Sequence, residues 1–390
     1  MTRFGAALAT PFLVCGLTLS LADSAQARSF RVLHAFLDGA DGASPDAPMI
    51  EDAAGNLFGT ALQGGAGNDG VVFEIAANGA ESVLYSFKGG TDGDKPQAGL
   101  IEDASGNLYG TTYFGGPSCN CGTVFRLAPN GTETVLYAFR DGNDGENPQA
   151  GLIADGAGNL YGTATGGGTS GNGTVFKLAP NGTFTVLHSF TGGSDGDYPQ
   201  AGLIMDRKGN LYGTASGGGT NDDGTVFRIS AHGKFSVLHA FGDGNDGVNP
   251  VAALIEDKAG NLYGTTRLGG GIGCFDGGCG TVFRLAPDGT ETVLYAFKGG
   301  SDGGEPYAGV TADRKGNLYG TTITGGSPDG YGTAFRIATD GTFKVLHTFT
   351  GPKDGEYPNA GLILGNSGEL YGTTYAGGAH IWGTVFKLAK

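Results

Sequence analysis

Short apolar runs bounded by Gly, Asn, Asp or Pro recur along the whole chain. A Val-Leu-(His/Tyr)-x-Phe segment starts with Val at 32, 83, 135, 186, 237, 293 and 345, which gives steps of 51, 52, 51, 51, 56 and 52 residues. In the second unit, a Gly/Asp loop and a Pro precede apolar runs at 98–103, 107–112 and 122–127. The pattern therefore predicts seven units with four short extended segments each.

These segments are typical of β-strands. Val, Ile, Leu, Tyr, Phe and Thr dominate them, and no helical period is present. The Asp-x-x-Gly-Asn pattern at 103–107 predicts a hairpin in which the Asp side chain accepts hydrogen bonds from turn amides. The pairs Asn130-Gly131, Asn181-Gly182, Asp288-Gly289 and Asp340-Gly341 predict type I′ hairpins after the third strand. Consecutive strands should therefore pair antiparallel.

Seven four-stranded antiparallel units predict an all-β, seven-bladed β-propeller. The chain ends at 383–390 in the third strand of a unit, and the segment 30–36 stands alone before the first complete unit. We expect this N-terminal strand to pair with the C-terminal strand and close the ring, which removes exposed sheet edges. Blade boundaries are predicted near 47, 98, 150, 201, 252, 308 and 360. The first strand of each unit should be innermost and the Val-Leu-x-x-Phe strand outermost.

The N-terminal residues 1–27 are predicted to be a secretory signal peptide. Arg3 provides the positive charge, residues 12–21 are mostly apolar, and Ala25-Gln26-Ala27 is a small-x-small cleavage site. A lipoprotein signal at Cys15 is disfavoured because Val14 occupies a position that requires a small residue. Residues 28–390 should form one propeller domain, monomeric and without a membrane span, in the periplasm or outside the cell.

Composition narrows the choice of partners. The 78 Gly residues follow no G-X-Y period, which excludes a collagen helix. The formal net charge of −15 argues against nucleic acid and against an anionic membrane surface, because both require clustered Lys and Arg. Cations, cationic polymers and neutral sugars remain open.

The sequence resembles a family of bacterial exported proteins, the choice-of-anchor tandem repeat GloVer-containing proteins, which are related in motif to the HAF extracellular repeats. The resemblance rests on the strings at 103–112, 122–127 and 32–36, and it covers 30–390. It implies an exported repeat protein. The family brings no established activity, so the resemblance does not identify the chemistry.

An Asp recurs in every blade-joining loop and is the first candidate for ligand binding. The seven residues are Asp41, Asp92, Asp144, Asp195, Asp246, Asp302 and Asp354. Their surroundings are similar to a calcium loop, but the distal bidentate Glu of an EF-hand is missing. Alternatively, each Asp accepts hydrogen bonds from its own turn, or the seven form an acidic ring that attracts cations. Bound Ca²⁺ is the one cofactor left open.

Aromatic residues and histidines supply further candidates. His34, His188, His239 and His347 share one repeat position with Tyr85, Tyr137 and Tyr295, which favours a partly buried aromatic between blades over a metal ligand. His380 and Trp382 break the repeat on the loop face and are candidates for stacking on a sugar ring, with rim packing as the alternative. Tyr113, Phe114, Arg267, Leu268, Phe275 and Tyr331 lie in the same loops.

Four cysteines remain once Cys15 leaves with the signal peptide. We expect local disulfides between Cys119 and Cys121 and between Cys274 and Cys279, since an exported chain matures in an oxidising compartment.

No catalytic residue can be assigned from the sequence. The chain contains no H-E-x-x-H and no P-loop, and its Gly-rich strings follow hairpins and never open a helix. The favoured interpretation is an exported, non-catalytic binding or scaffold propeller that presents its Gly/Asp-rich loops to a glycan, a protein or a matrix polymer. The alternative is a metal-dependent hydrolase, because Asp-x-x-Gly-Asn-Leu-Tyr is similar to the blade motif of gluconolactonase-type propellers. Glu51, Glu102 and Glu256 are its candidate carboxylates near the inner strands.

Overall fold

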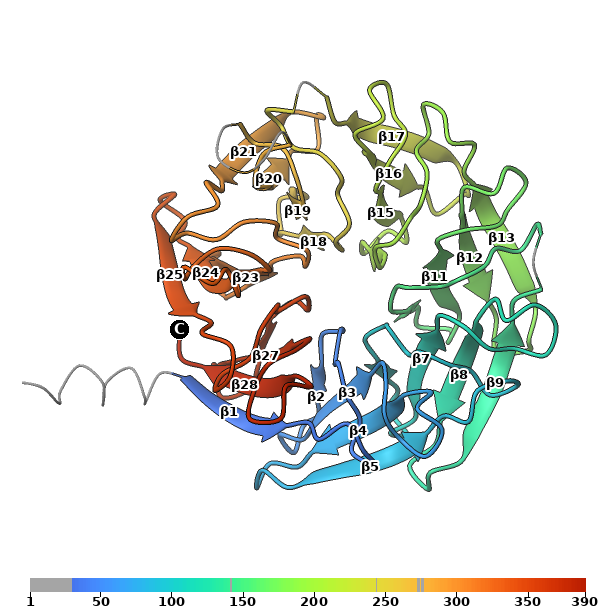
Figure 1. Ribbon diagram of the computed structural model, residues 1–390. Helices are drawn as coiled ribbons and strands as arrows, with labels where there is room; N and C mark the ends of the chain where they lie inside the picture. The colour runs from blue at the N-terminus through green and yellow to red at the C-terminus, as the bar shows by residue number, and fades with distance from the viewer. Residues whose placement is uncertain (1–29, 141, 243, 272–273, 275–276) are drawn as a thin grey trace, which may run out of the picture.

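A computed structural model describes residues 30–140, 142–242, 244–271, 274 and 277–390. It shows seven four-stranded antiparallel sheets arranged as a closed ring (Figure 1), and the described residues contain no helix. The predicted all-β, seven-bladed propeller is confirmed. The signal peptide and its cleavage site lie outside the described residues. No helix in the described part of the chain is long and apolar enough to cross a membrane.

Blades one to six run from the ring axis outward in chain order. Blades one to three contain β2 (Ile50–Glu51), β3 (Leu57–Ala61), β4 (Val71–Ile75), β5 (Glu81–Ser86); β6 (Ile101–Glu102), β7 (Leu108–Thr112), β8 (Thr123–Leu127), β9 (Glu133–Ala138); and β10 (Ile153–Ala154), β11 (Leu160–Ala164), β12 (Thr174–Leu178), β13 (Phe184–Ser189).

Blades four to six contain β14 (Ile204–Met205), β15 (Leu211–Ala215), β16 (Thr225–Ile229), β17 (Phe235–Ala240); β18 (Ile255–Glu256), β19 (Leu262–Thr266), β20 (Thr281–Leu285), β21 (Glu291–Ala296); and β22 (Thr311–Ala312), β23 (Leu318–Thr322), β24 (Thr333–Ile337), β25 (Phe343–Thr348). Blade seven combines β26 (Ile363–Leu364), β27 (Leu370–Thr374) and β28 (Thr384–Leu388) with β1 (Phe30–Ala35).

The two ends of the chain close the ring, as predicted. Strand β1 pairs antiparallel with β28, with Phe30 opposite Leu388 and Ala35 opposite Thr384. In Figure 1 the blue β1 lies beside the red β28. Every sheet therefore has four strands, and the described chain contributes both termini to one blade.

The hydrophobic core lies between neighbouring blades. One cluster combines Val72 and Phe87 of blade one with Leu108 and Phe125 of blade two. The ring of Phe125 lies over Gly110, where an added Cβ would come within 2.7 Å of the ring, so this position requires Gly. Between blades, Thr111 Oγ1 donates a hydrogen bond to the Ala150 carbonyl oxygen at 3.0 Å. The equivalent bond occurs in all seven blades, which explains the repeated Gly-Thr.

Two local predictions need correction. The innermost strands span only two residues each, because the residues before them pack against the preceding blade: a Cβ on Gly309 would lie 2.4 Å from the Ala253 carbonyl oxygen. The type I′ prediction is wrong. Gly131 has φ 81° but Asn130 does not lie in the positive-φ region, and Pro129 fixes a negative φ, so the hairpin is a type I turn followed by a left-handed Gly.

Candidate functional site

The Gly/Asp loops and the Gly-Gly loops meet on one side of the ring, which we call the loop face. Their backbones pair directly: Asp94 N donates to the Phe114 carbonyl oxygen at 3.0 Å, and Phe114 N donates to the Asp94 carbonyl oxygen at 2.9 Å. The opposite side carries the two hairpin turns of each blade, and we call it the hairpin face. The rigid pairing fixes the backbone from which the loop-face side chains project.

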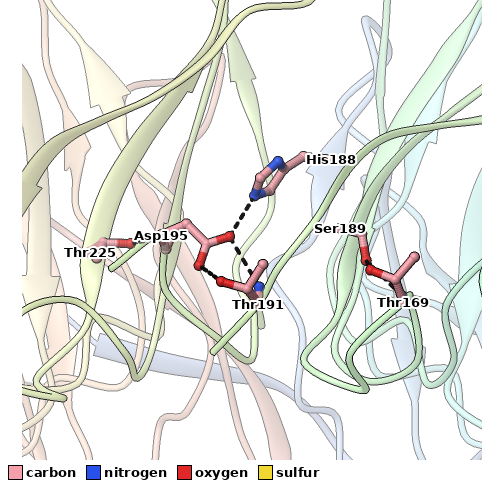
Figure 2. A network of polar contacts seen from close by, with 6 residues as sticks. All are labelled: Thr169, His188, Ser189, Thr191, Asp195 and Thr225. Carbon is pink, nitrogen blue, oxygen red and sulfur yellow. Dashed lines mark hydrogen bonds and ion pairs between the residues drawn. The ribbon is translucent and has the colours of Figure 1, made fainter. Parts of the chain in front are cut away.

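Each of the seven loop Asp residues accepts a hydrogen bond from the His or Tyr seven residues earlier. In blade three, His188 Nε2 donates to Asp195 at 3.1 Å, and Thr191 N donates to the same carboxylate at 3.0 Å (Figure 2). The other pairs are His34–Asp41 (3.2 Å), Tyr85–Asp92 (2.8 Å), Tyr137–Asp144 (2.6 Å), His239–Asp246 (3.0 Å), Tyr295–Asp302 (2.9 Å) and His347–Asp354 (2.9 Å).

This contact accounts for the exchange of His and Tyr between blades. An imidazole Nε2–H and a phenol O–H both place a donor at the far end of a flat ring, so either satisfies the same carboxylate. Burial alone would raise the pKa of Asp195, but the hydrogen bonds from Thr191 and His188 outweigh it and lower that pKa. Within the described residues, no group of three or more His, Cys, Asp or Glu side chains is placed to hold a metal ion.

In four blades the ring of the His or Tyr also contacts the next blade. These four rings stack on a Phe at the start of the neighbouring outer strand, at centroid distances of 3.6–3.9 Å: His188–Phe235, Tyr137–Phe184, Tyr295–Phe343 and His347–Phe30. The other three blades carry Glu81, Glu133 and Glu291 at this position, each with a buried Oε1 that has no hydrogen-bond partner. Burial, and then the Asp92 charge, raises the pKa of Glu133 to about 7.

The predicted pair His380 and Trp382 separates in the structure. His380 is exposed, whereas Trp382 is partly buried and packs on the core cluster that includes Phe36. Ile381 between them has φ 66° and is 65% exposed. The sequence interpretation had not considered Ile381, because it carries no polar group.

The residue before each loop Pro adopts a left-handed conformation in all seven blades, with φ between 49° and 63°. These residues are Ser44, Lys95, Asn147, Tyr198, Asn249, Glu305 and Tyr357. Such a φ is uncommon for a residue other than Gly, and a following Pro disfavours helical backbone angles further. Backbone hydrogen bonds hold the position: Asn147 N donates to the Cys121 carbonyl oxygen at 2.7 Å. The backbone is constant here while the side chain changes from blade to blade.

The residue after each loop Pro begins the segment that leads to the innermost strand. These seven residues, which we call the axial ring, are Asp46, Gln97, Gln149, Gln200, Val251, Tyr307 and Asn359. Neighbours contact each other: Gln149 Nε2 donates to Gln97 Oε1 at 3.3 Å, and Asn359 Nδ2 donates to Asp46 Oδ1 at 2.8 Å. The axial ring therefore gathers different polar groups at the loop-face end of the axis.

The side chains in and beside the axial ring differ most from each other in blades five, six, seven and one. Arg267 pairs with Glu305 at 3.0 Å, and its guanidinium carbon lies 5.9 Å from the Tyr307 ring centroid. Burial raises the pKa of Asp46 to about 6, although the Asn359 hydrogen bond opposes the shift. Burial and the Asp46 charge raise the pKa of Tyr307. Of these residues the sequence identified only Arg267; the available signal was variation after each Pro in an otherwise constant repeat.

The predicted disulfides are present. Cys119 is bonded to Cys121 in the β7–β8 loop and Cys274 to Cys279 in the β19–β20 loop, with Cα–Cα distances of 5.2 and 5.1 Å. Phe275, another candidate from the sequence, lies outside the described residues. Each bridge lies within a single loop, so neither of them links two blades.

The fold and the loop face define the class: a seven-bladed propeller assembled from near-identical blades. The sequence matches the Gloeobacter/Verrucomicrobia repeat over residues 19–209, 77–277 and 275–390, and the chain belongs to that family. This confirms the resemblance inferred from the motifs. No curated protein matches the chain.

Solved structures share the fold at low sequence identity. Virginiamycin B lyase from Staphylococcus aureus is 13% identical with a TM-score of 0.62, covering 93% of this chain and 99% of that one. The extracellular domain of a one-component system from B. thetaiotaomicron is 9% identical with a TM-score of 0.58, covering 92% of this chain and 40% of that one. PorZ of Porphyromonas gingivalis is 15% identical with a TM-score of 0.53, covering 87% and 46%. At these identities the likeness establishes the fold alone.

Proposed function

We propose that the protein is an exported, non-catalytic binding propeller that receives a glycan on its loop face, with the axial ring as the centre of the site. The observation that carries this proposal is the asymmetry of the axial ring. Seven blades with nearly the same backbone place an acid, four amides, a phenol and an apolar side chain at one end of the axis. A ligand lying across the axis contacts several blades at once, and their differences provide specificity.

The chemistry of this face suits hydroxyl-rich ligands. Gln and Asn side chains each offer donors and an acceptor, and the Asp46 carboxylate accepts, so together they complement sugar hydroxyls. Tyr198 and Tyr357 are 47% and 39% exposed and provide flat faces for the apolar side of a sugar ring. A neutral glycan is also compatible with the net charge of −15.

Two features of the chain support export. The N-terminal sequence has the pattern of a signal peptide, two disulfides are formed, and disulfides persist in oxidising compartments. Two proteins of similar fold are described as an extracellular domain and as a bacterial surface component of the type IX secretion system. A metal-dependent hydrolase would need converging ligands, and no observation on the described residues favours one.

A glycan array with the purified protein tests the proposal, followed by calorimetry on the best ligand. Gln149→Ala and Asn359→Ala should each weaken binding about tenfold, since each removes contacts worth about 1 kcal/mol or more. Ser105→Ala, an exposed position on the hairpin face, is the matched control and should bind like the wild type. The proposal fails if no glycan binds, or if all three variants bind equally well.

A further inference from the structure

A cavity of about 830 Å³ opens on the hairpin face between blades four and five, away from the loop face. Its polar wall comes from the inner hairpin turns of both blades and from Arg228 on β16, and its apolar wall includes Leu238, Leu262 and Leu285. This volume lies within the range typical of small-molecule sites. The cavity is therefore large enough to hold a small ligand.

Four cations line this cavity: Arg207, Lys208, Arg228 and Lys258. None of them forms an ion pair with another of the described residues. The Nε atom of Arg228 is buried and has no hydrogen-bond partner in the described part of the protein. A buried guanidinium Nε–H without a hydrogen-bond partner is costly, so an acceptor from outside the chain would stabilise it.

The equivalent Arg126, Arg284 and Arg336 of other blades also have a buried Nε without a partner, but Arg284 and Arg336 make another side-chain hydrogen bond within the described residues. Arg336 donates to Asn317 Oδ1 at 3.1 Å, Arg284 donates to Thr292 Oγ1 at 3.4 Å, and Lys387 pairs with Glu369 at 3.2 Å. Arg126, which also has an unpartnered Nε, lines a smaller cavity of about 190 Å³ between blades two and three. Among the described residues at this position, Arg126 and Arg228 are the two Arg residues without any side-chain hydrogen bond or ion pair, and both line a cavity.

Two of the three acids in the cavity wall are occupied by their own turns. Asp206 accepts hydrogen bonds from Lys208 N at 2.8 Å and Tyr212 Oη at 3.2 Å, and Asp257 makes the equivalent contacts. Hydrogen bonds from Asn210, and then those from Lys208 and Tyr212, overcome the effect of burial and lower the pKa of Asp206, so it stays ionised within its turn. Glu256 is the third acid, so the wall contains four cations and three carboxylates and still has an excess of one positive charge.

The sequence of the inner turn differs in blade four and supplies two of these cations. The two residues that follow the first Asp of the inner turn are Ala53-Ala54, Ala104-Ser105 and Gly156-Ala157 in blades one to three, and Arg207-Lys208 in blade four. Turn formation uses only the Asp, Gly and Asn, so the two cations are not needed for the fold.

We propose that this cavity binds an anionic saccharide, with the acid group on the Arg228 guanidinium. A planar guanidinium fork matches a carboxylate or sulfate in bidentate geometry, and Arg207, Lys208 and Lys258 add attraction. The Leu side chains and Tyr212 offer an apolar surface to the sugar ring. This local site differs in sign from the chain as a whole, and it is separate from the loop-face site.

Calorimetry on the purified full chain tests the site, with D-glucuronate as the probe and D-glucose and sodium sulfate for comparison. We expect glucuronate to bind at least tenfold more tightly than glucose, and added salt to weaken it. Arg228→Gln should reduce the affinity at least tenfold. The double variant Arg207→Ala/Lys208→Ser should do the same, and thermal melts check that both variants fold.

Blade six provides the matched control. Arg314 and Lys315 occupy the same turn but do not line the cavity, so Arg314→Ala/Lys315→Ser should leave glucuronate binding unchanged. The loop-face variant Asn359→Ala should leave it unchanged too. The proposal is overturned if glucuronate does not bind, if only sulfate binds, or if both double variants weaken binding equally.

Discussion

The substitution Glu133→Phe should stabilise the protein, and more so at high pH than at low pH. Glu133 occupies the interblade position where four other blades place a Phe against a His or Tyr ring. Its Oε1 is buried without a hydrogen-bond partner, and Asp92 of the preceding blade adds a like charge. The substitution replaces an unfavourable carboxylate with the ring that the repeat normally uses.

The magnitude follows from the pKa of Glu133, which rises from 4.5 to about 7 on folding. In the unfolded chain the carboxyl ionises first, so folding stability falls as pH rises from 4.5 to about 7 and stays reduced above that. The full shift corresponds to about 3.4 kcal/mol, and solvent screening of this partly exposed group reduces it to about 1 kcal/mol. The new aromatic stack adds about 1 kcal/mol at every pH.

Urea unfolding at about pH 4.5 and about pH 8 measures both contributions. Glu133→Phe should gain about 1 kcal/mol at the lower pH and about 2 kcal/mol at the higher one. Glu133→Gln removes the charge without adding a ring and should gain stability only at the higher pH. The reverse change Phe184→Glu, at the same position of blade three, should destabilise most at the higher pH. A gain for Glu133→Phe that is equal at both pH values would refute the ionisation argument.

Three further predictions concern the loop face. His188→Tyr should change the free energy of unfolding by less than about 0.5 kcal/mol, since Tyr fills this position in three blades. His188→Leu should lower the free energy of unfolding by about 1–2 kcal/mol, because it removes a hydrogen-bond donor to Asp195. Chemical denaturation distinguishes the two variants. Asp46→Asn should stabilise the protein by about 1 kcal/mol at about pH 8 but not at about pH 4, because the pKa of Asp46 is about 6 in the folded protein and 3.8 in the unfolded chain. Equal shifts of the melting temperature at both pH values would contradict this reasoning. Neither EDTA nor millimolar Ca²⁺ should move the melting temperature, because each loop Asp already accepts a side-chain and a backbone hydrogen bond; a rise with Ca²⁺ would show a metal site.

The amino-acid sequence alone determined the number of blades, their strand order and the closure of the ring. These follow from local signals: short apolar runs, turn residues at fixed offsets, and a lone N-terminal strand that matches the missing one. The Asp of the inner turn was also predictable, because its contacts with Ser105 N and Asn107 N span two and four residues. Local backbone chemistry is sufficient for such features.

The tertiary structure decided which side chains meet between blades. Asn359 and Asp46 are 313 residues apart in sequence and hydrogen-bonded across the ring closure. The raised pKa of Glu133 depends on Asp92 of the neighbouring blade, and the cavity at Arg228 depends on how blades four and five pack. The repeat pattern describes each blade by itself, whereas these contacts depend on the spacing and orientation of two sheets and on the reach of each side chain, which only the assembled ring fixes.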